Sequence, residues 1–135
     1  MDVAEALAFV EQHHRAVLIT TRADGRPQAS PVLCGVGGGQ VMVSTREKAM
    51  KTRNARRDPR ISLCVVSDDF FSAWARVDGR AEIVPLPDAM EGLVDLYRSM
   101  SGEHPDWDDY RAAMVDQHRV LLRITVERAG PSRSG

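Results

Sequence analysis

Residues 16–44 read AVLITTRADGRPQASPVLCGVGGGQVMVS, a sequence in which short apolar segments alternate with turn signals. Asp24-Gly25 is typical of a hairpin turn, and the glycines at 37–39 turn the chain a second time. The segments between the turns are apolar and rich in β-branched residues, which favours extended structure. They predict three consecutive strands, over residues 16–21, 28–34 and 40–44.

Three further strands are expected in the rest of the chain. A buried strand is predicted over residues 61–66, where the sequence is ISLCVV. A long strand over 70–84 is interrupted at Asp78-Gly79, which indicates either a bulge or a tight turn. The last strand is predicted over 120–126, with the sequence VLLRITV.

Four helices are expected around these strands. Apolar residues at helical spacing predict a helix that begins near Val3 and ends near His13, a second over residues 90–100 and a third from Trp107. A further helix is predicted over about 45–57. Its expected N-terminus is the S-x-x-E capping box of Ser44 and Glu47, and Pro59 follows its end.

These elements do not alternate as strand, helix, strand, helix, which argues against a parallel sheet. They predict an α+β, mainly β fold: a six-stranded antiparallel barrel with peripheral helices. The chain of 135 residues is long enough for one core. We expect a single domain over residues 1–128 and a flexible tail over 129–135, because that end is rich in small and polar residues.

The overall charge excludes a strongly basic or acidic protein. Lysine and arginine total 18, aspartate and glutamate 19, so the net charge is -1, and nucleic acid is not an expected partner. The sequence has neither a long apolar run nor a signal peptide, so the expectation is a cytoplasmic protein without a membrane span. Cys34 and Cys64 lie in apolar segments and are expected to be buried and reduced, ahead of a disulfide or a redox centre.

Positive charge is concentrated between Arg46 and Arg60, where seven basic residues oppose two acidic ones, a net charge of +5. The N-terminus of the helix expected there offers free N–H groups at Ser44 and Thr45, with Lys51 as a charged partner, so a phosphate or carboxylate could bind. The alternative is a solvated surface helix, and part of the cluster must be solvated because its members cannot all share one helix face.

Pro31 lies in the middle of the predicted second strand, although proline cannot donate to a strand ladder. It therefore indicates an edge or a bulge. Such a backbone could accept a flat ligand, or Pro31 could only prevent unwanted strand pairing. The four histidines lack the spacing of a helical metal pair, so neither a metal site nor an acid/base residue is predicted.

Two groups of residues carry a family resemblance. The stretches DGRPQASPV at 24–32 and ST…KTRN…RDPR between Ser44 and Arg60 resemble the pyridoxamine 5'-phosphate oxidase-like split barrels. The stretch GEHPDWDDYR at 102–111 resembles, more narrowly, the actinobacterial deazaflavin-dependent branch of the flavin/deazaflavin oxidoreductases.

The resemblance implies a homodimer of split β-barrels that binds coenzyme F-420 or a flavin in a groove at the subunit interface. It implies that the cofactor ring lies against the strand of Pro31 and is lined by Gln28, Ser30, Pro31 and Val32. The phosphate and the anionic oligoglutamate tail then meet Ser44, Thr45, Arg46 and Lys51, with Arg53 and Asn54 as further candidates. Trp74 is a candidate aromatic residue of the cofactor or substrate pocket, or plain core.

The function implied is a coenzyme F-420-dependent reductase. Hydride passes from C5 of the reduced deazaflavin to an activated double bond in a small organic acceptor such as an enone, a quinone or a tetrapyrrole, and the cofactor carries the chemistry. Two alternatives stay open: an FMN-dependent oxidase or reductase of the pyridoxamine phosphate oxidase type, and a non-enzymatic protein that carries the deazaflavin.

Overall fold

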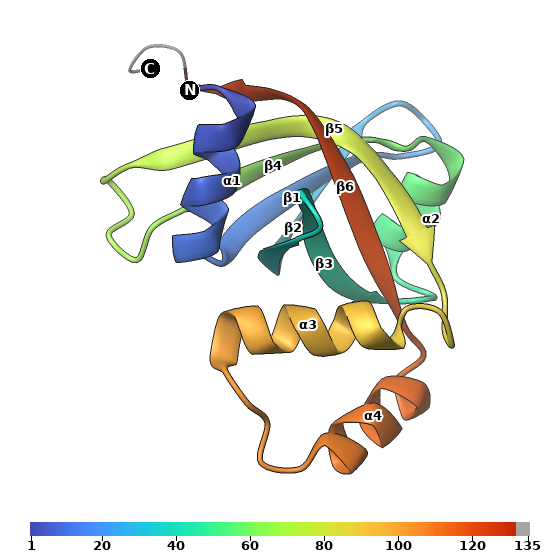
Figure 1. The fold of residues 1–135 in the computed structure, drawn as a ribbon. Coiled ribbons are helices and arrows are strands. Elements are labelled where there is room, and N and C mark those ends of the chain that lie inside the picture. Colours follow the sequence, from blue (N-terminus) through green and yellow to red (C-terminus); the bar gives the residue numbers. More distant parts are fainter. Residues whose placement is uncertain (132–135) are drawn as a thin grey trace.

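The computed structural model describes residues 1–131 and contains six antiparallel strands that close into a barrel (Figure 1). The strands are β1 Arg15–Thr21, β2 Pro27–Gly37, β3 Gln40–Arg46, β4 Arg60–Val66, β5 Trp74–Val84 and β6 Arg119–Gly130. Their order around the barrel is β1-β2-β3-β6-β5-β4, and β4 pairs with β1 to complete it. The predicted six-stranded antiparallel barrel is thus confirmed.

Turn chemistry and one bulge set the register of the strands. Gly38 and Gly39 join β2 to β3 and have φ angles of 61° and 75°, which glycine adopts without steric cost and which suit the twist of a two-residue hairpin. The register between β5 and β6 shifts between Asp78 and Gly79. Of the two interpretations of Asp78-Gly79, the bulge is correct.

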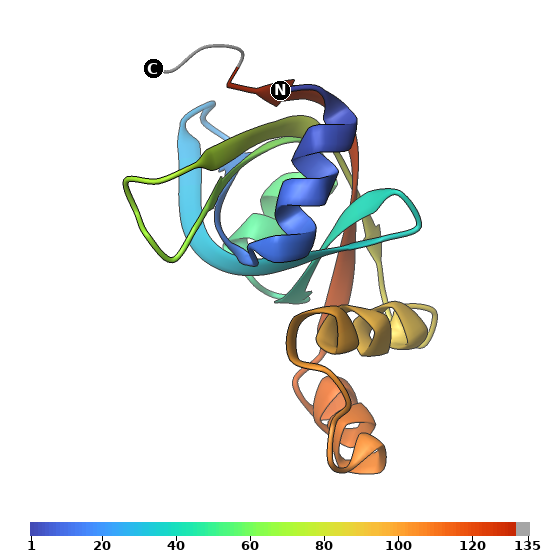
Figure 2. The same cartoon turned by 60° about the vertical axis from the view of Figure 1, so that its left-hand side comes forward.

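Four helices lie around the barrel: α1 Val3–Gln12, α2 Met50–Arg57, α3 Met90–Ser101 and α4 Trp107–Asp116. Helix α1 covers one opening of the barrel, and α2 lies on the side away from it (Figure 2). Ala6 and Val10 of α1 are fully buried against the barrel, and a capping box of Asp2 and Glu5 begins the helix. Helices α3 and α4 pack outside the barrel wall (Figure 1).

Side-chain alternation divides the apolar residues into two clusters. Inward-facing residues such as Val41, Val43 and Leu122 fill the barrel. Their neighbours Met42 and Leu121 point outward and pack beneath α3 and α4. The outer face of β3 and β6 therefore faces the two helices, and this arrangement positions the cavity described below.

The helix predicted over 45–57 begins later than expected. Strand β3 continues to Arg46, which pairs with Arg119 of β6, and α2 begins only at Met50, after Ala49. The capping box predicted for Ser44 and Glu47 is wrong, because pairing with β6 keeps Ser44 in the strand. Glu47 instead forms an ion pair with Arg56 at 2.6 Å.

Two other boundaries differ from the prediction. Strand β5 begins at Trp74 instead of residue 70, because residues 70–72 form a turn. Strand β6 pairs with β5 as far as Gly130, so Ala129 and Gly130 belong to the barrel and not to a tail. Residues 132–135 of the predicted tail lie outside the described residues.

Both cysteines carry free thiols. Cys34 on β2 is fully buried and Cys64 on β4 is half-buried. Strands β2 and β4 are not neighbours in the barrel, since β1 lies between them. Within residues 1–131, no helix has the length and apolar character needed to span a membrane.

Candidate functional site

A cavity of about 530 Å³ lies between the barrel wall and the helices α3 and α4. The barrel supplies Pro31, Val32, Leu33, Ser44, Thr45, Arg46 and Arg119 to its lining. The helices and the turn before α2 supply Ala49, Lys51, Leu96, Tyr97, Met100, Tyr110 and Met114.

The cavity borders an unpaired edge of β2. This strand pairs with β1 from Pro27 to Leu33, but with β3 only from Cys34 onward. The amide of Cys34 donates to the carbonyl of His14 at 2.8 Å, so every second amide of β2 faces β1. The nitrogen of Pro31 therefore faces the unpaired side, where no ladder bond is lost. Pro31 marks an open edge, one of the two possibilities its position indicated.

Cations line one part of the cavity. The side chains of Arg46, Lys51 and Arg119 reach it, and none of the lining residues is acidic. Among the ion pairs of residues 1–131, none includes any of these three cations. Burial, and secondarily the charge of Arg46, lowers the pKa of the Arg119 guanidinium. The cavity is therefore electropositive and suited to an anion.

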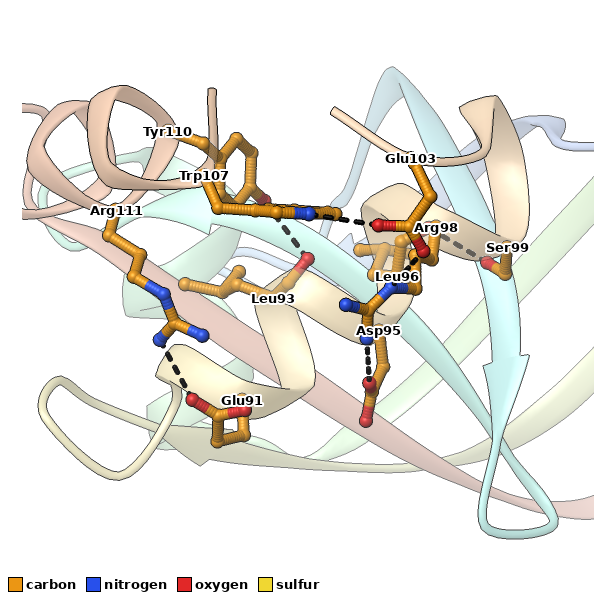
Figure 3. Close-up of polar contacts among 10 residues, drawn as sticks. All are labelled: Glu91, Leu93, Asp95, Leu96, Arg98, Ser99, Glu103, Trp107, Tyr110 and Arg111. Atoms are coloured by element: carbon orange, nitrogen blue, oxygen red, sulfur yellow. Dashed lines mark hydrogen bonds and ion pairs between the residues drawn. The ribbon is translucent and has the colours of Figure 1, made fainter. Parts of the chain in front are cut away.

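Helices α3 and α4 supply an apolar and aromatic wall. The rings of Tyr97 and Tyr110 lie 5.1 Å apart between their centroids, and Met100 and Met114 complete the surface. The hydroxyl of Tyr110 donates to the carbonyl of Leu93 at 2.9 Å (Figure 3). Burial raises the pKa of Tyr110, so its phenol stays protonated at neutral pH.

Several residues that the sequence analysis named come together here. They are Pro31, Val32, Ser44, Thr45, Arg46 and Lys51, which all line the cavity. They come from three elements, namely β2, β3 and α2. Ser44 and Thr45 contribute from a strand and not from a helix N-terminus.

The other named residues lie elsewhere. Gln28 accepts a hydrogen bond from the Thr20 hydroxyl at 3.1 Å, and Asn54 is buried with its amide bonded within the chain. The Ser30 hydroxyl is buried without a hydrogen-bond partner among the described residues. Arg53 is exposed on α2, and Trp74 begins β5 opposite Val66; neither lines the cavity.

Sequence reasoning missed the contribution of α3, α4 and the start of β6. Tyr97, Met100, Tyr110 and Met114 had the helical spacing of core-facing residues, and they do face the barrel. Helical spacing does not show which part of such a face borders a cavity. Arg119 carried a weak signal, since it is a charged residue immediately before the apolar run of β6.

The open-edged barrel and its cationic cavity define a split-barrel protein with a site for an anionic ligand. The chain belongs to the pyridoxamine 5'-phosphate oxidase family, whose model matches residues 3–132. This is a family of flavin- and deazaflavin-type oxidoreductases.

Solved structures share the fold. A conserved hypothetical protein from Mycobacterium tuberculosis is 27% identical with a TM-score of 0.78, over 100% of this chain and 92% of that one. An F-420 reductase is 22% identical with a TM-score of 0.71, over 91% and 94% of the two chains. A candidate pyridoxamine 5'-phosphate oxidase from Listeria innocua is 20% identical with a TM-score of 0.70, over 98% of each chain.

Proposed function

We propose that the protein is a coenzyme F-420-dependent reductase that acts on an activated double bond in a small organic acceptor. One observation carries the proposal: the unpaired edge of β2 at Pro31 and the cations Arg46 and Lys51 border the same cavity, which no acidic residue lines. A flat ring with an anionic substituent suits this combination of an open backbone edge and unpaired cations.

The residues present fit such a cofactor. Pro31 and Val32 offer the backbone edge for the ring, and Ser44 and Thr45 offer hydroxyls beside the cations that would hold the phosphate and the anionic tail. When bound and reduced, the cofactor supplies a hydride. The chain's own residues bind and orient it, and side chains of α3 and α4 form the wall of the cavity on that side.

Two features support the deazaflavin over FMN. Two cations of the basic cluster, Arg46 and Lys51, line the cavity without a carboxylate partner among the described residues, which is more positive charge than a single phosphate needs. The structural relatives also include an F-420 reductase. An FMN-dependent oxidase or reductase is the second candidate, favoured by the structural likeness to the Listeria innocua protein. A protein that only carries the deazaflavin is the third.

We also propose that a second copy of the chain covers the face formed by strands β1 and β2 beside the cavity. Val17 and Leu33 have exposed fractions of 36% and 56%, although both are apolar strand residues. A homodimer would remove this surface from water and protect the open edge of β2. A solution mass of one chain would refute the dimer without affecting the cofactor assignment.

Turnover tests the proposed activity. The protein is mixed with reduced F-420 and, separately, with reduced FMN, each with a panel of enones, quinones and tetrapyrroles, and cofactor oxidation is followed by absorbance. Acceptor-dependent oxidation of F-420 is the expected result. Oxidation of FMN alone would assign the protein to the second candidate, and tight F-420 binding without turnover would favour the carrier.

A further inference from the structure

The part of the cavity beneath α3 and α4 has a chemistry of its own. Tyr97 and Tyr110 present rings there, and Arg119 adds a cation from the start of β6. None of these three residues belongs to the cofactor-holding set proposed above. This part of the cavity therefore suits a ligand group that combines a flat apolar surface with an anion.

The environment of Arg119 lacks a counter-charge. Arg119 is half-buried and lies directly opposite Arg46 in the β3–β6 register, and like charges in that relation repel. Its Nε donates to the neutral Gln117 Oε1 at 2.9 Å, and no ion pair of residues 1–131 includes it. The terminal guanidinium nitrogens have no hydrogen-bond partner among the described residues, so a bound anion would supply the counter-charge that Arg119 lacks.

Other arginines on the two helices are neutralised, in contrast to Arg119. Arg111 on α4 pairs with Glu91 on α3 at 2.8 Å, and Arg98 pairs with Glu103 at 2.7 Å (Figure 3). Arg119, which lies beneath the same two helices, has no such partner among the described residues.

Contacts among residues that do not line the cavity support the aromatic wall. Glu103 accepts hydrogen bonds from Arg98 Nε at 2.7 Å and from Trp107 Nε1 at 2.9 Å, and the Arg98 guanidinium lies 4.9 Å from the centre of the Trp107 ring (Figure 3). Trp107 in turn contacts Tyr97 edge to face at 5.7 Å. These contacts join α3, the loop that follows it and the start of α4, and so support the aromatic wall.

Tyr110 offers the cavity ring surface and not a proton. The Tyr110 hydroxyl proton is used in the bond to the Leu93 carbonyl, so Tyr110 presents its ring to the cavity. Stacking on such rings favours planar, conjugated molecules.

We propose that the α3/α4 part of the cavity is a subsite for a planar conjugated molecule that carries an anionic group, with the ring against Tyr97 and Tyr110 and the anion on Arg119. The proposal rests on the proposed function only in naming this molecule as the acceptor. The reductase is then selective for anionic acceptors over uncharged ones of the same shape.

Two fluorescent probes test the subsite without the cofactor. Anilinonaphthalene sulfonate combines a planar naphthalene ring with a sulfonate, and N-phenyl-naphthylamine is its uncharged counterpart. Arg119→Gln should weaken the anionic probe about tenfold, the usual loss for one charge-assisted hydrogen bond, and change the uncharged probe less than twofold. Arg119→Lys should recover part of the loss.

Arg123→Gln is the matched control, because Arg123 lies on the same face of β6 but does not line the cavity. It should leave both probes unchanged. Binding of the uncharged probe also shows that the Arg119 variant is folded. Equal losses for both probes, no loss for either, or no probe binding to the wild-type protein would overturn the subsite.

Coenzyme F-420 distinguishes this inference from the proposed function. At saturating F-420 the anionic probe should still bind to the wild-type protein, because the two ligands use different residues. Displacement of the probe by F-420 would overturn the separate subsite and leave the cofactor assignment intact. Failure of F-420 to bind, with the Arg119 dependence retained, would refute the reductase and leave the subsite standing.

Discussion

Asn54 and its neighbour Arg53 allow the structural and ligand-binding roles of α2 to be separated. The Asn54 side chain is 1% exposed, and its Nδ2 donates to Thr20 Oγ1 at 3.2 Å. Its Oδ1 accepts from Arg57 Nη2 at 3.1 Å. The first bond joins α2 to the end of β1, and the second lies within α2. Asn54→Ala removes both, although Thr20 keeps its bond to Gln28.

The expected loss follows from these contacts. A hydrogen bond contributes about 1 kcal/mol net, so Asn54→Ala should lower the free energy of unfolding by about 2 kcal/mol. For a domain of this size the melting temperature should fall by roughly 6–8 °C. Urea unfolding and thermal melting measure the change. Because Asn54 does not line the cavity, the affinity for F-420 in the folded state should change less than twofold.

Arg53→Gln is the matched control on the adjacent, exposed residue. It should leave the free energy of unfolding within about 0.5 kcal/mol of wild type, as expected for a surface substitution. An Asn54→Ala variant that is as stable as wild type but binds F-420 much more weakly would refute this separation of roles. That result would place the Asn54 amide in the ligand site, as the family resemblance implied.

Three other predictions follow from local geometry. Gly79→Ala should destabilise the protein by about 1–3 kcal/mol in urea unfolding, because a Cβ there would lie 2.1 Å from a backbone carbonyl oxygen of β6; Gly130→Ala, whose Cβ would meet only a flexible arginine side chain, should be close to neutral. Burial raises the pKa of Cys34 to about 12, so iodoacetamide at pH 8 should label this thiol only after unfolding. Mass spectrometry measures the labelling, and rapid labelling of the native protein would contradict the burial of Cys34. The hydrogen bond from the Arg60 side chain lowers the pKa of Asp58 from 3.8 to about 2. The stabilising contribution of ionised Asp58 is therefore present above pH 3.8 and is lost as the pH falls toward 2. NMR titration should show the Asp58 pKa return toward 3.8 in Arg60→Gln, and an unchanged value would count against the bond.

The strands could be predicted because their signals are local. The Asp24-Gly25 and Gly38-Gly39 turns separate β1, β2 and β3 in the sequence as they do in the barrel. The start of α2 could not be placed in this way. Ser44 satisfies the local pattern of a helix cap, but the partner that keeps it in β3 is Leu121, far along the chain. Pairing with a distant strand overrode the local signal.

In the candidate site, too, residues with a local sequence signal could be predicted, whereas residues whose role depends on distant contacts could not. Pro31, Ser44 and Lys51 were indicated by a proline in a strand and by a cluster of charge, and all three line the cavity. Tyr97 and Arg119 could not be assigned, because what they face depends on how α3 and α4 pack on β3 and β6. Asn54 lies in the same basic segment as Lys51, but it points into a buried network. Sequence position alone does not separate these two orientations.

The chain has two lysines, and they provide the most direct test of the proposed cofactor site. Lys51 lines the cavity, whereas Lys48 is exposed and does not. F-420 and FMN are titrated, at one moderate salt concentration, into wild type, Lys51→Gln and Lys48→Gln, and binding is followed by cofactor fluorescence. Wild type should bind F-420 more tightly than FMN. Lys51→Gln should weaken F-420 binding about five- to tenfold, whereas Lys48→Gln should bind F-420 as wild type does. Equal effects of the two lysine substitutions, or no binding of either cofactor to wild type, would contradict the assignment of this cavity as the cofactor site.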